Sequence, residues 1–396
     1  MTKNEIGIGV IGMGWMGLVH SRAYRTIDDR FHASGIRPRL VICADEVEAR
    51  AREAKERLGF EECTTNWKQA VSHPQVQVIN VTSPNHLHME MVRVATGAGK
   101  HVFCEKPVGC NSRETAQIAH LAREAAVLSW VGYNYRWAPV VQYARQLIES
   151  GKLGSLTHYR GRFLVDYGSN PDGVLSWRFQ RELAGHGTLG DLMSHVVDMA
   201  HMLAGPIRRV VGNQKTFITS RPVATPGQGT HFSVNANAPR APVTNEDYVG
   251  ALAQFACGAQ GSLEVCRVAK GPRCEMTFEI NGTLGAIKWN YERMNELSLF
   301  LPDGTDEHDG PVLIQAGPAH PGYSLFYPGP GNSMSYEDLK AIEAFEFLKS
   351  VITGKQAEPG FAEALNVAAV QDAIARSWTS EGWETVETLS DRGLGA

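Results

Sequence analysis

Short, mainly apolar runs alternate with amphipathic stretches over the first part of the chain. The apolar runs predict buried strands at residues 6–11, 39–44, 76–81, 101–104 and 127–132. The stretches between them predict helices at residues 18–24, 46–58, 67–71, 89–97 and 111–126. Residues 28–38 fit neither pattern, and we expect an inserted loop there. The alternation of strand and helix predicts an α/β domain with a doubly wound parallel sheet.

The pattern changes after Gly154. Apolar and polar positions now alternate strictly, which predicts strands at residues 156–165, 210–218, 247–255, 261–267 and 273–280, and residues 281–285 supply a hairpin turn. Helices are expected at residues 139–150, 336–353 and 361–377, with a last short strand at 383–386. We therefore expect two domains, residues 1–136 and 137–396. The second would be an α+β domain with a large, open, mostly antiparallel sheet, and its last helix would pack back on the first domain.

Two long stretches show no periodic pattern. Residues 220–246 are rich in Pro, Gly, Asn and Thr, and residues 302–335 combine Gly-Pro and Pro-Gly pairs with Tyr323, Phe326 and Tyr327. Loops of this length in a compact enzyme are usually lids, intersubunit arms or disorder. The aromatic side chains argue against simple disorder.

Composition excludes several classes of protein. The 396 residues are 43% hydrophobic and 20% charged, which is typical of a globular chain long enough for two cores. The net charge is −4 and no basic patch stands out, which argues against a nucleic-acid partner. No apolar run approaches the roughly 20 residues that span a bilayer. The first residues lead straight into the first strand, so we expect no signal peptide. The 7 cysteines are scattered without a CxxC pair, which favours a reducing cytoplasm over disulfides or zinc.

Residues 12–17 read GMGWMG, a GxGxxG motif between the first predicted strand and the first predicted helix. Gly12 would allow the tight turn, Gly14 would let the backbone approach a pyrophosphate, and Gly17 would let the helix sit close to the sheet. The free N–H groups at the start of the helix would then face the anion. The motif predicts a dinucleotide cofactor.

Asp45 follows the second predicted strand. An acidic side chain in this place accepts hydrogen bonds from the adenosine ribose and repels a 2′-phosphate, which favours NAD over NADP. The separation from Gly17 is long for this motif. The alternative is that Asp45 only caps the predicted helix at residues 46–58.

Polar segments follow the next two strands. Residues 82–88 read TSPNHLH and residues 105–107 read EKP. Both lie at the carboxyl ends of parallel strands, where open α/β sheets bind ligands. We expect Lys106, held between an apolar strand and Pro107, to point into the cofactor crevice.

Residues 187–199 predict one helix that is entered through glycines. Asp191 and His195 are four positions apart and would share one face of it. Such a pair suits alcohol oxidation, because the imidazole can take the hydroxyl proton while the carboxylate orients the substrate. His186 and His201 are off this face, so we expect no metal site. The plain alternative is a surface helix with a salt-bridged histidine.

In order and spacing these motifs resemble the glucose–fructose oxidoreductase/inositol dehydrogenase (Gfo/Idh/MocA) family, and the resemblance covers nearly the whole chain. Residues 176–180, 290–293 and 317–321 are similar to one subgroup of it. That subgroup contains NAD-dependent scyllo-inositol dehydrogenases active on L-glucose, and levoglucosan dehydrogenase. The resemblance implies a Rossmann domain that binds NAD, and a substrate domain whose open sheet builds a homotetramer.

The motifs and the resemblance together imply a set of site residues. The cofactor would be bound by Gly12, Met13, Gly14, Trp15, Met16, Asp45, Thr82, Pro84, Asn85, His88, Glu105 and Lys106. The catalytic groups would be Lys106, Asp191 and His195. The substrate would contact these three and also Tyr135, Arg178 and His320.

Each group has a chemical reason for its assignment. His195 would act as the general base, and Lys106 would stabilise the alkoxide that develops in the transition state. Asp191 would accept hydrogen bonds from the reacting or adjacent hydroxyl. Arg178 keeps its charge and can donate to two vicinal hydroxyls. Tyr135 would line the wall of the site.

His320 lies in one of the two long stretches without a periodic pattern. It would reach a substrate only if that loop folds over the site, from its own subunit or a neighbouring one. An ordinary loop histidine is the alternative.

The predicted activity is NAD-dependent oxidation of a secondary hydroxyl of a cyclic polyol or sugar, with scyllo-inositol and L-glucose placed first. Levoglucosan or another pyranose is the alternative substrate. A non-catalytic NAD-binding regulator would be expected to lack Lys106, Asp191 or His195, and all three are present. A glycosidase that uses NAD transiently would release its product without net NADH.

Overall fold

The computed structural model describes residues 4–224, 232–302, 304 and 309–387. These residues form two compact units. Unit 1 holds the residues up to Trp137 together with Met334–Leu365, and unit 2 holds Ala138–Ser333 and the residues from Asn366 onward. The segment Met334–Leu365, expected in the second domain, groups with unit 1 because its helix α10 (Tyr336–Thr353) packs along α1 (Trp15–Arg30).

The sheet of unit 1 has six parallel strands in the order β3-β2-β1-β4-β5-β6. The strands are β1 (Asn4–Ile11), β2 (Ile36–Ala44), β3 (Glu62–Thr64), β4 (Val78–Val81), β5 (His101–Cys104) and β6 (Ser129–Val131). The strand order reverses between β1 and β4, which is where doubly wound sheets bind dinucleotides. The predicted doubly wound sheet is confirmed.

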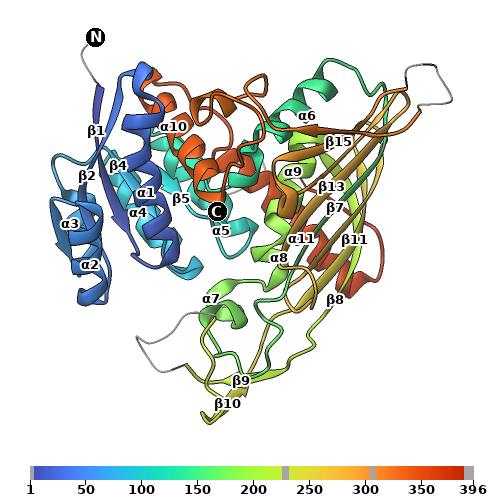
Figure 1. Cartoon of the computed structure of the whole chain (residues 1–396). Helices are drawn as coiled ribbons and strands as arrows, with labels where there is room; N and C mark the ends of the chain where they lie inside the picture. The colour runs from blue at the N-terminus through green and yellow to red at the C-terminus, as the bar shows by residue number, and fades with distance from the viewer. Residues whose placement is uncertain (1–3, 225–231, 303, 305–308, 388–396) are drawn as a thin grey trace. The chain divides into compact units, whose positions relative to one another are not determined.

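Helices flank this sheet (Figure 1). They are α1 (Trp15–Arg30), α2 (Glu48–Leu58), α3 (Trp67–Ser72), α4 (His88–Gly97), α5 (Ser112–Glu124) and α10 (Tyr336–Thr353), with the short helices η1 (His32–Ser34), η2 (Asn85–Leu87) and η3 (Asn134–Trp137). Side-chain caps fix three of the starts, and Asn66 accepts the N–H of Lys68 at the start of α3. Asn111 accepts the N–H of Glu114 before α5, and Ser335 with Asp338 forms a capping box on α10.

The loop expected at residues 28–38 is largely regular structure. α1 continues to Arg30, η1 follows, and β2 begins at Ile36 after Gly35 turns the chain with a φ of +72°. Buried Ile27, Phe31 and Ile36 hold these residues against the rest of unit 1. The polar positions between them hid this pattern in the sequence.

The sheet of unit 2 has nine strands in the order β16-β15-β14-β13-β7-β12-β11-β8-β17. They are β7 (Leu156–Val165), β8 (Ile207–Lys215), β11 (Tyr248–Phe255), β12 (Gln260–Cys266), β13 (Cys274–Gly282), β14 (Ala286–Asn290), β15 (Glu296–Phe300), β16 (Val312–Gln315) and β17 (Glu384–Thr385). β7 and β12 are parallel, and the other neighbouring pairs among the described strands are antiparallel. The sheet is therefore mostly antiparallel, as predicted.

The helices of unit 2 are α6 (Pro139–Glu149), α7 (Arg181–Ala184), α8 (Thr188–Asp191), α9 (Met193–Ala204) and most of α11 (Phe361–Ser380), with the short helices η4 (Trp177–Phe179), η5 (Tyr291–Arg293) and η6 (Tyr323–Leu325). α9 packs against β7, β12 and β13 (Figure 1). Along β7, Tyr159 and Phe163 are buried, while Arg160 and Arg162 are exposed and pair with glutamates of β13. One face of the sheet therefore carries the core and the other is charged.

The two long stretches contain short elements. Within residues 220–246, β9 (Ser220–Pro222) pairs antiparallel with β10 (Arg240–Pro242), while residues 225–231 lie outside the described part. Within residues 302–335, β16 and η6 form, and the buried Tyr323 hydroxyl lies 2.7 Å from the carbonyl oxygen of Asn332. Of the helices in the described ranges, none is both long and apolar enough to cross a bilayer.

Candidate functional site

The three motif glycines have distinct structural reasons. Gly12 has a φ of +95° and donates its N–H to the carbonyl of Ala44 at 2.8 Å. A Cβ at Gly17 would lie 2.0 Å from the carbonyl oxygen of Gly12, so only glycine allows this close approach of α1. A Cβ at Gly14 would meet nothing within 4 Å. The backbone at Gly14 is therefore open to a ligand.

The start of α1 fits a pyrophosphate. Gly14 is the N-cap residue and supplies no side-chain cap, and the first turn holds no acidic residue. The first N–H groups of the helix, together with the positive end of its dipole, are suited to an anion. Trp15 is 56% exposed beside this turn and stacks on Tyr336, with ring centroids 5.6 Å apart. Met13 is buried, and the sulfur of Met16 lies 3.7 Å from the Tyr336 hydroxyl.

Asp45 is attached to the glycine-rich turn. Its Oδ2 accepts the N–H of Met13 at 2.7 Å, and its Oδ1 accepts the N–H of Val47 at 2.9 Å. α2 begins at Glu48 with Val47 as its N-cap residue, so Asp45 is not the capping residue of that helix. Its carboxylate ties the end of β2 to the turn over which a dinucleotide would lie.

Thr82 and His88 hold backbone turns. The Thr82 hydroxyl donates to the carbonyl of Gly12 at 2.6 Å and so joins the end of β4 to the glycine turn. His88 is fully buried, with its ring nitrogens 2.9 Å from the Ser83 carbonyl oxygen and 3.0 Å from that of Pro107. Burial lowers the pKa of His88. Both ring nitrogens face backbone carbonyls, so His88 links the turn after β4 to the turn after β5.

Two more of the predicted cofactor residues begin the short helix after β4. Pro84 is the N-cap residue of η2, and Asn85 is its first residue and is buried. These positions place both residues at the carboxyl end of β4, the edge at which open α/β sheets bind ligands.

Glu105 lies in a buried ionic cluster directly before Lys106. Its Oε1 accepts hydrogen bonds from Lys340 Nζ at 2.8 Å and from His20 Nε2 at 2.6 Å, and its Oε2 accepts the backbone N–H of Lys106 at 3.2 Å. Lys340 also pairs with Glu343 at 2.9 Å. We call His20, Glu105, Lys340 and Glu343 the unit 1 cluster.

The cluster has a definite charge state. Burial raises the pKa of Glu105, but the charge of Lys340 and the bond from His20 outweigh it and hold that pKa well below the usual value. Burial and the charge of Lys340 lower the pKa of His20 to about 4, so His20 is neutral near neutral pH. Glu105 is therefore an ionised anchor for the backbone of Lys106.

Sequence reasoning missed Lys340 and Tyr336, both on α10. Lys340 is fully buried. The sequence feature that could have indicated this is a charged residue among the apolar positions of a predicted helix. Tyr336 contacts Trp15 and Met16 and makes an edge-to-face contact with the predicted substrate residue Tyr135, at a centroid distance of 6.4 Å. Tyr135 itself is buried in η3.

Asp191 and His195 do not share one continuous helix, contrary to prediction. α8 ends at Asp191 and α9 begins at Met193. The N–H of His195 bonds to the carbonyl of Leu192, and the carbonyl of Asp191 instead accepts the Ser194 hydroxyl at 3.1 Å. Side-chain bonds of this kind compete with helical hydrogen bonds and bend helices. His195 is buried, with its ring 6.0 Å from that of Phe163.

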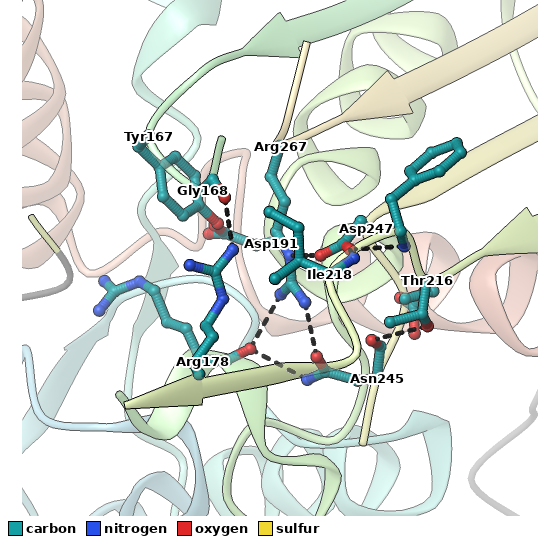
Figure 2. Close-up of polar contacts among 12 residues, drawn as sticks. Tyr167, Gly168, Arg178, Asp191, Thr216, Ile218, Asn245, Asp247 and Arg267 are labelled. Atoms are coloured by element: carbon teal, nitrogen blue, oxygen red, sulfur yellow. Dashed lines mark hydrogen bonds and ion pairs between the residues drawn. The ribbon is translucent and has the colours of Figure 1, made fainter. Parts of the chain in front are cut away.

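Unit 2 brings Asp191 and Arg178 into one polar neighbourhood around Tyr167, as Figure 2 shows. The Tyr167 hydroxyl donates to Asp191 Oδ2 at 2.9 Å. Burial and the charge of Asp191 raise the pKa of Tyr167, while the charges of Arg267 and Arg178 act in the opposite direction. The guanidinium of Arg178 lies 4.3 Å from the ring centroid of Trp177. Sequence reasoning did not find Tyr167.

A second buried ionic cluster supports this neighbourhood. Arg267 pairs with Asp247 at 2.8 Å and donates to Asn245 Oδ1 at 2.8 Å, and both Arg267 and Asn245 donate to the carbonyl of Arg178 at 3.0 Å (Figure 2). Glu246 accepts the N–H of Leu189 at 2.9 Å, at the start of α8. We call Asn245, Glu246, Asp247 and Arg267 the unit 2 cluster.

His320 forms contacts within its own loop and unit. Its Nδ1 lies 3.0 Å from the N–H nitrogen of Gly317, and its ring packs edge-to-face on Tyr143 of α6 at 5.0 Å. The structure thus accounts for His320 by a local turn and by contact with a helix of unit 2.

Comparisons with known proteins match both units. Residues 6–133 match the oxidoreductase family with an NAD-binding Rossmann fold, and residues 141–288 match the GFO/IDH/MocA C-terminal domain. Levoglucosan dehydrogenase of Pseudarthrobacter phenanthrenivorans is 36% identical over 387 residues, covering 98% of this chain and 99% of that protein.

A solved structure of levoglucosan dehydrogenase also matches this chain over nearly its whole length. Levoglucosan dehydrogenase in complex with NADH and levoglucosan is 36% identical and matches with a TM-score of 0.91, covering 97% of this chain and 100% of that one. The NAD(+)-dependent scyllo-inositol 2-dehydrogenase of Bacillus subtilis is 25% identical over 205 residues, covering 51% of this chain and 55% of that protein.

Proposed function

This chain belongs to the GFO/IDH/MocA family of oxidoreductases, and we propose that it oxidises a ring hydroxyl of a pyranose of the levoglucosan type, with NAD as the acceptor. It is an NAD-dependent sugar or polyol dehydrogenase. The observation that carries the choice of substrate is the full-length likeness to levoglucosan dehydrogenase, which extends over both units.

This choice reverses the order of substrates predicted from the sequence. The scyllo-inositol dehydrogenase relative matches only about half of the chain, whereas the levoglucosan dehydrogenase likeness includes the segments with Arg178, Asp191 and His195. We retain scyllo-inositol, with L-glucose as its mimic, as the second candidate. The two classes share secondary hydroxyls on a six-membered ring, which the same groups can bind.

The residues of unit 1 fit NAD by their local geometry. The open backbone at Gly14 and the uncapped start of α1 would hold the pyrophosphate. Asp45 would accept hydrogen bonds from the adenosine ribose, and its negative charge would disfavour a 2′-phosphate. When bound, NAD would supply the hydride acceptor.

Side chains of the protein would remove the proton of the reacting hydroxyl and stabilise the resulting alkoxide. His195 would remove it from the reacting hydroxyl as a general base. Lys106 would stabilise the alkoxide, a charge that is largest in the transition state. Asp191 would accept a hydrogen bond from the reacting or adjacent hydroxyl, and Arg178 would donate to vicinal hydroxyls. Tyr135 and His320 would also contact the substrate.

The test is formation of NADH by purified protein with levoglucosan, D-glucose, L-glucose and inositols. We expect the highest kcat/KM with levoglucosan. A preference for scyllo-inositol would replace the proposed substrate while leaving the reaction class intact. Release of a sugar leaving group without net NADH would indicate a glycosidase, and NADH binding without turnover on any substrate would indicate a regulator.

Two further expectations remain proposals. A homotetramer built through the outer face of the unit 2 sheet is consistent with Leu252 of β11, which is 54% exposed on that face. The cytoplasm is the proposed compartment, and all seven cysteines are free thiols in the structure. We propose neither a nucleic-acid partner nor a membrane partner.

A further inference from the structure

Tyr167 links two of the proposed substrate-binding segments of unit 2. It comes two residues after the end of β7, its hydroxyl donates to Asp191 Oδ2 at 2.9 Å, and its ring centroid lies 6.5 Å from that of Phe179. Phe179 directly follows Arg178 in η4. One tyrosine therefore contacts both the carboxylate of Asp191 and the segment that carries Arg178.

The segment around Phe179 is itself fixed. The guanidinium groups of Arg221 and Arg267 lie over the Phe179 ring at 4.0 Å and 4.4 Å from its centroid. Arg267 and Asn245 also hold the carbonyl of Arg178. The Tyr167 ring thus rests on a rigid surface, and a rigid donor holds its acceptor in one orientation at little entropic cost.

Burial also keeps the phenol protonated. The pKa of Tyr167 is raised by burial and by the charge of Asp191, so the hydroxyl remains a hydrogen-bond donor at neutral pH. A carboxylate that accepts such a bond is fixed in rotation as well as in position.

We propose that Tyr167 is a positioning residue that orients the Asp191 carboxylate toward the sugar and couples it to the Arg178 segment. The inference rests on the proposed function, because it assigns Asp191 to substrate hydroxyls. Tyr167 itself acts through Asp191.

The chain offers a matched control. Tyr159 lies in β7, the strand that ends two residues before Tyr167. It is fully buried, and its hydroxyl has no hydrogen-bond partner among the described residues. Tyr159→Phe and Tyr167→Phe each remove one phenol oxygen in unit 2, from a buried ring at Tyr159 and from a half-buried ring at Tyr167. Only the second removes a bond to Asp191.

The experiment compares kcat, KM for levoglucosan and NADH affinity in wild type, Tyr167→Phe and Tyr159→Phe. We expect Tyr167→Phe to lose about ten- to one hundredfold in kcat/KM, the range for a hydrogen bond to a charged group. Its NADH affinity and melting temperature should stay close to wild type. Tyr159→Phe should change kcat/KM less than about threefold, since it removes an unbonded hydroxyl.

A double-mutant cycle with Asp191→Asn separates positioning from general structural damage. Sugar affinity of the NADH complex is measured by calorimetry in all four proteins. If Tyr167 acts through Asp191, Tyr167→Phe lowers sugar affinity in the wild-type background and changes it little in the Asp191→Asn background. An equal loss in both backgrounds overturns the inference.

The remaining outcomes are also decisive. An active wild-type enzyme with an unaffected Tyr167→Phe variant overturns the positioning role and leaves the proposed function standing. If Tyr159→Phe loses as much kcat/KM as Tyr167→Phe, the positioning role is likewise overturned and the proposed function stands. A wild-type protein that forms no NADH with any sugar overturns the proposed function, and the positioning role with it.

Discussion

The two units each bury a cluster of charges behind proposed site residues, but the clusters differ in chemistry. In the unit 1 cluster Lys340 pairs with Glu105 and Glu343, and Glu105 also bonds to His20 and to the backbone N–H of Lys106. The unit 2 cluster centres on the Arg267–Asp247 pair and holds the carbonyl of Arg178. The first contains a histidine that changes its charge at acid pH, with a pKa of about 4. The second is built on a guanidinium that does not.

Because of this difference, we expect the two clusters to respond differently when one of their buried charges is removed. A buried pair is costly to break because one charge is left without compensation. In unit 1 the remaining groups can restore balance by taking up a proton, since His20 is neutral and Glu105 and Glu343 are ionisable. In unit 2, Arg267 keeps its charge, and Asp247 Oδ2 also accepts the N–H groups of Phe217 and Ile218. We therefore expect removal of one charge to cost more stability in the unit 2 cluster than in the unit 1 cluster.

The largest expected effect is that of Arg267→Met. The side chains of Arg267 and Asp247 are both fully buried, so the variant leaves a buried carboxylate without its cation. We expect a loss of about 3–5 kcal/mol in the free energy of unfolding, measured by urea denaturation at neutral pH. Arg160→Met, which breaks an exposed pair with Glu279, is the control and should change stability by less than about 1 kcal/mol. A loss in Arg267→Met no greater than in the control would contradict the account of the unit 2 cluster.

The second effect is acid sensitivity from His20. The unfolded pKa of a histidine is about 6.5, whereas His20 in the fold titrates at about 4. Between these values the unfolded chain binds the proton and the folded protein does not, so stability falls as pH decreases from 6.5 toward 4. The full contribution is about 3 kcal/mol at the lower end.

The test is the pH dependence of unfolding in wild type and His20→Gln. The glutamine amide can still donate to Glu105 but does not titrate. We expect a shallower decline between pH 6.5 and 4 in the variant. Parallel curves for the two proteins would remove His20 as a source of the acid sensitivity.

The smallest of the three effects is that of Lys340→Met at neutral pH. Loss of Lys340 removes a charge that lowers the pKa of His20, so His20 can take up a proton and pair with Glu105 in its place. We expect a destabilisation of about 2 kcal/mol, less than for an uncompensated buried charge. The gap between wild type and variant should narrow as pH falls below 6.5. A loss as large as that of Arg267→Met, with no narrowing, would show that the two clusters respond alike.

The sequence predicted unit 1 well because its signals are local. The positions of Gly12 and Gly17 in the turn follow from contacts between neighbouring segments of one βαβ unit. Lys340 could not be predicted, because its partner Glu105 lies 235 residues away along the chain. Only the tertiary fold brings them together.

The proposed site residues of unit 2 were harder to predict from the sequence, for a different reason. Its strands were predicted from alternation, but its proposed site residues depend on irregular structure. The break between Asp191 and His195 lies where the Ser194 hydroxyl bonds to the Asp191 carbonyl, and a helical pattern of apolar residues continues through it. Tyr167 and Asn245 lie outside regular elements, where their partners leave no periodic signal in the sequence.

The most direct test of the central claim is the His195→Ala variant, assayed for NADH formation with levoglucosan and for NADH binding. The account predicts that turnover falls by at least about a hundredfold, the lower range for loss of a general base, while NADH binds as in wild type because unit 1 is unchanged. Turnover close to wild type would contradict the assignment of His195 as the base and the proposed mechanism with it.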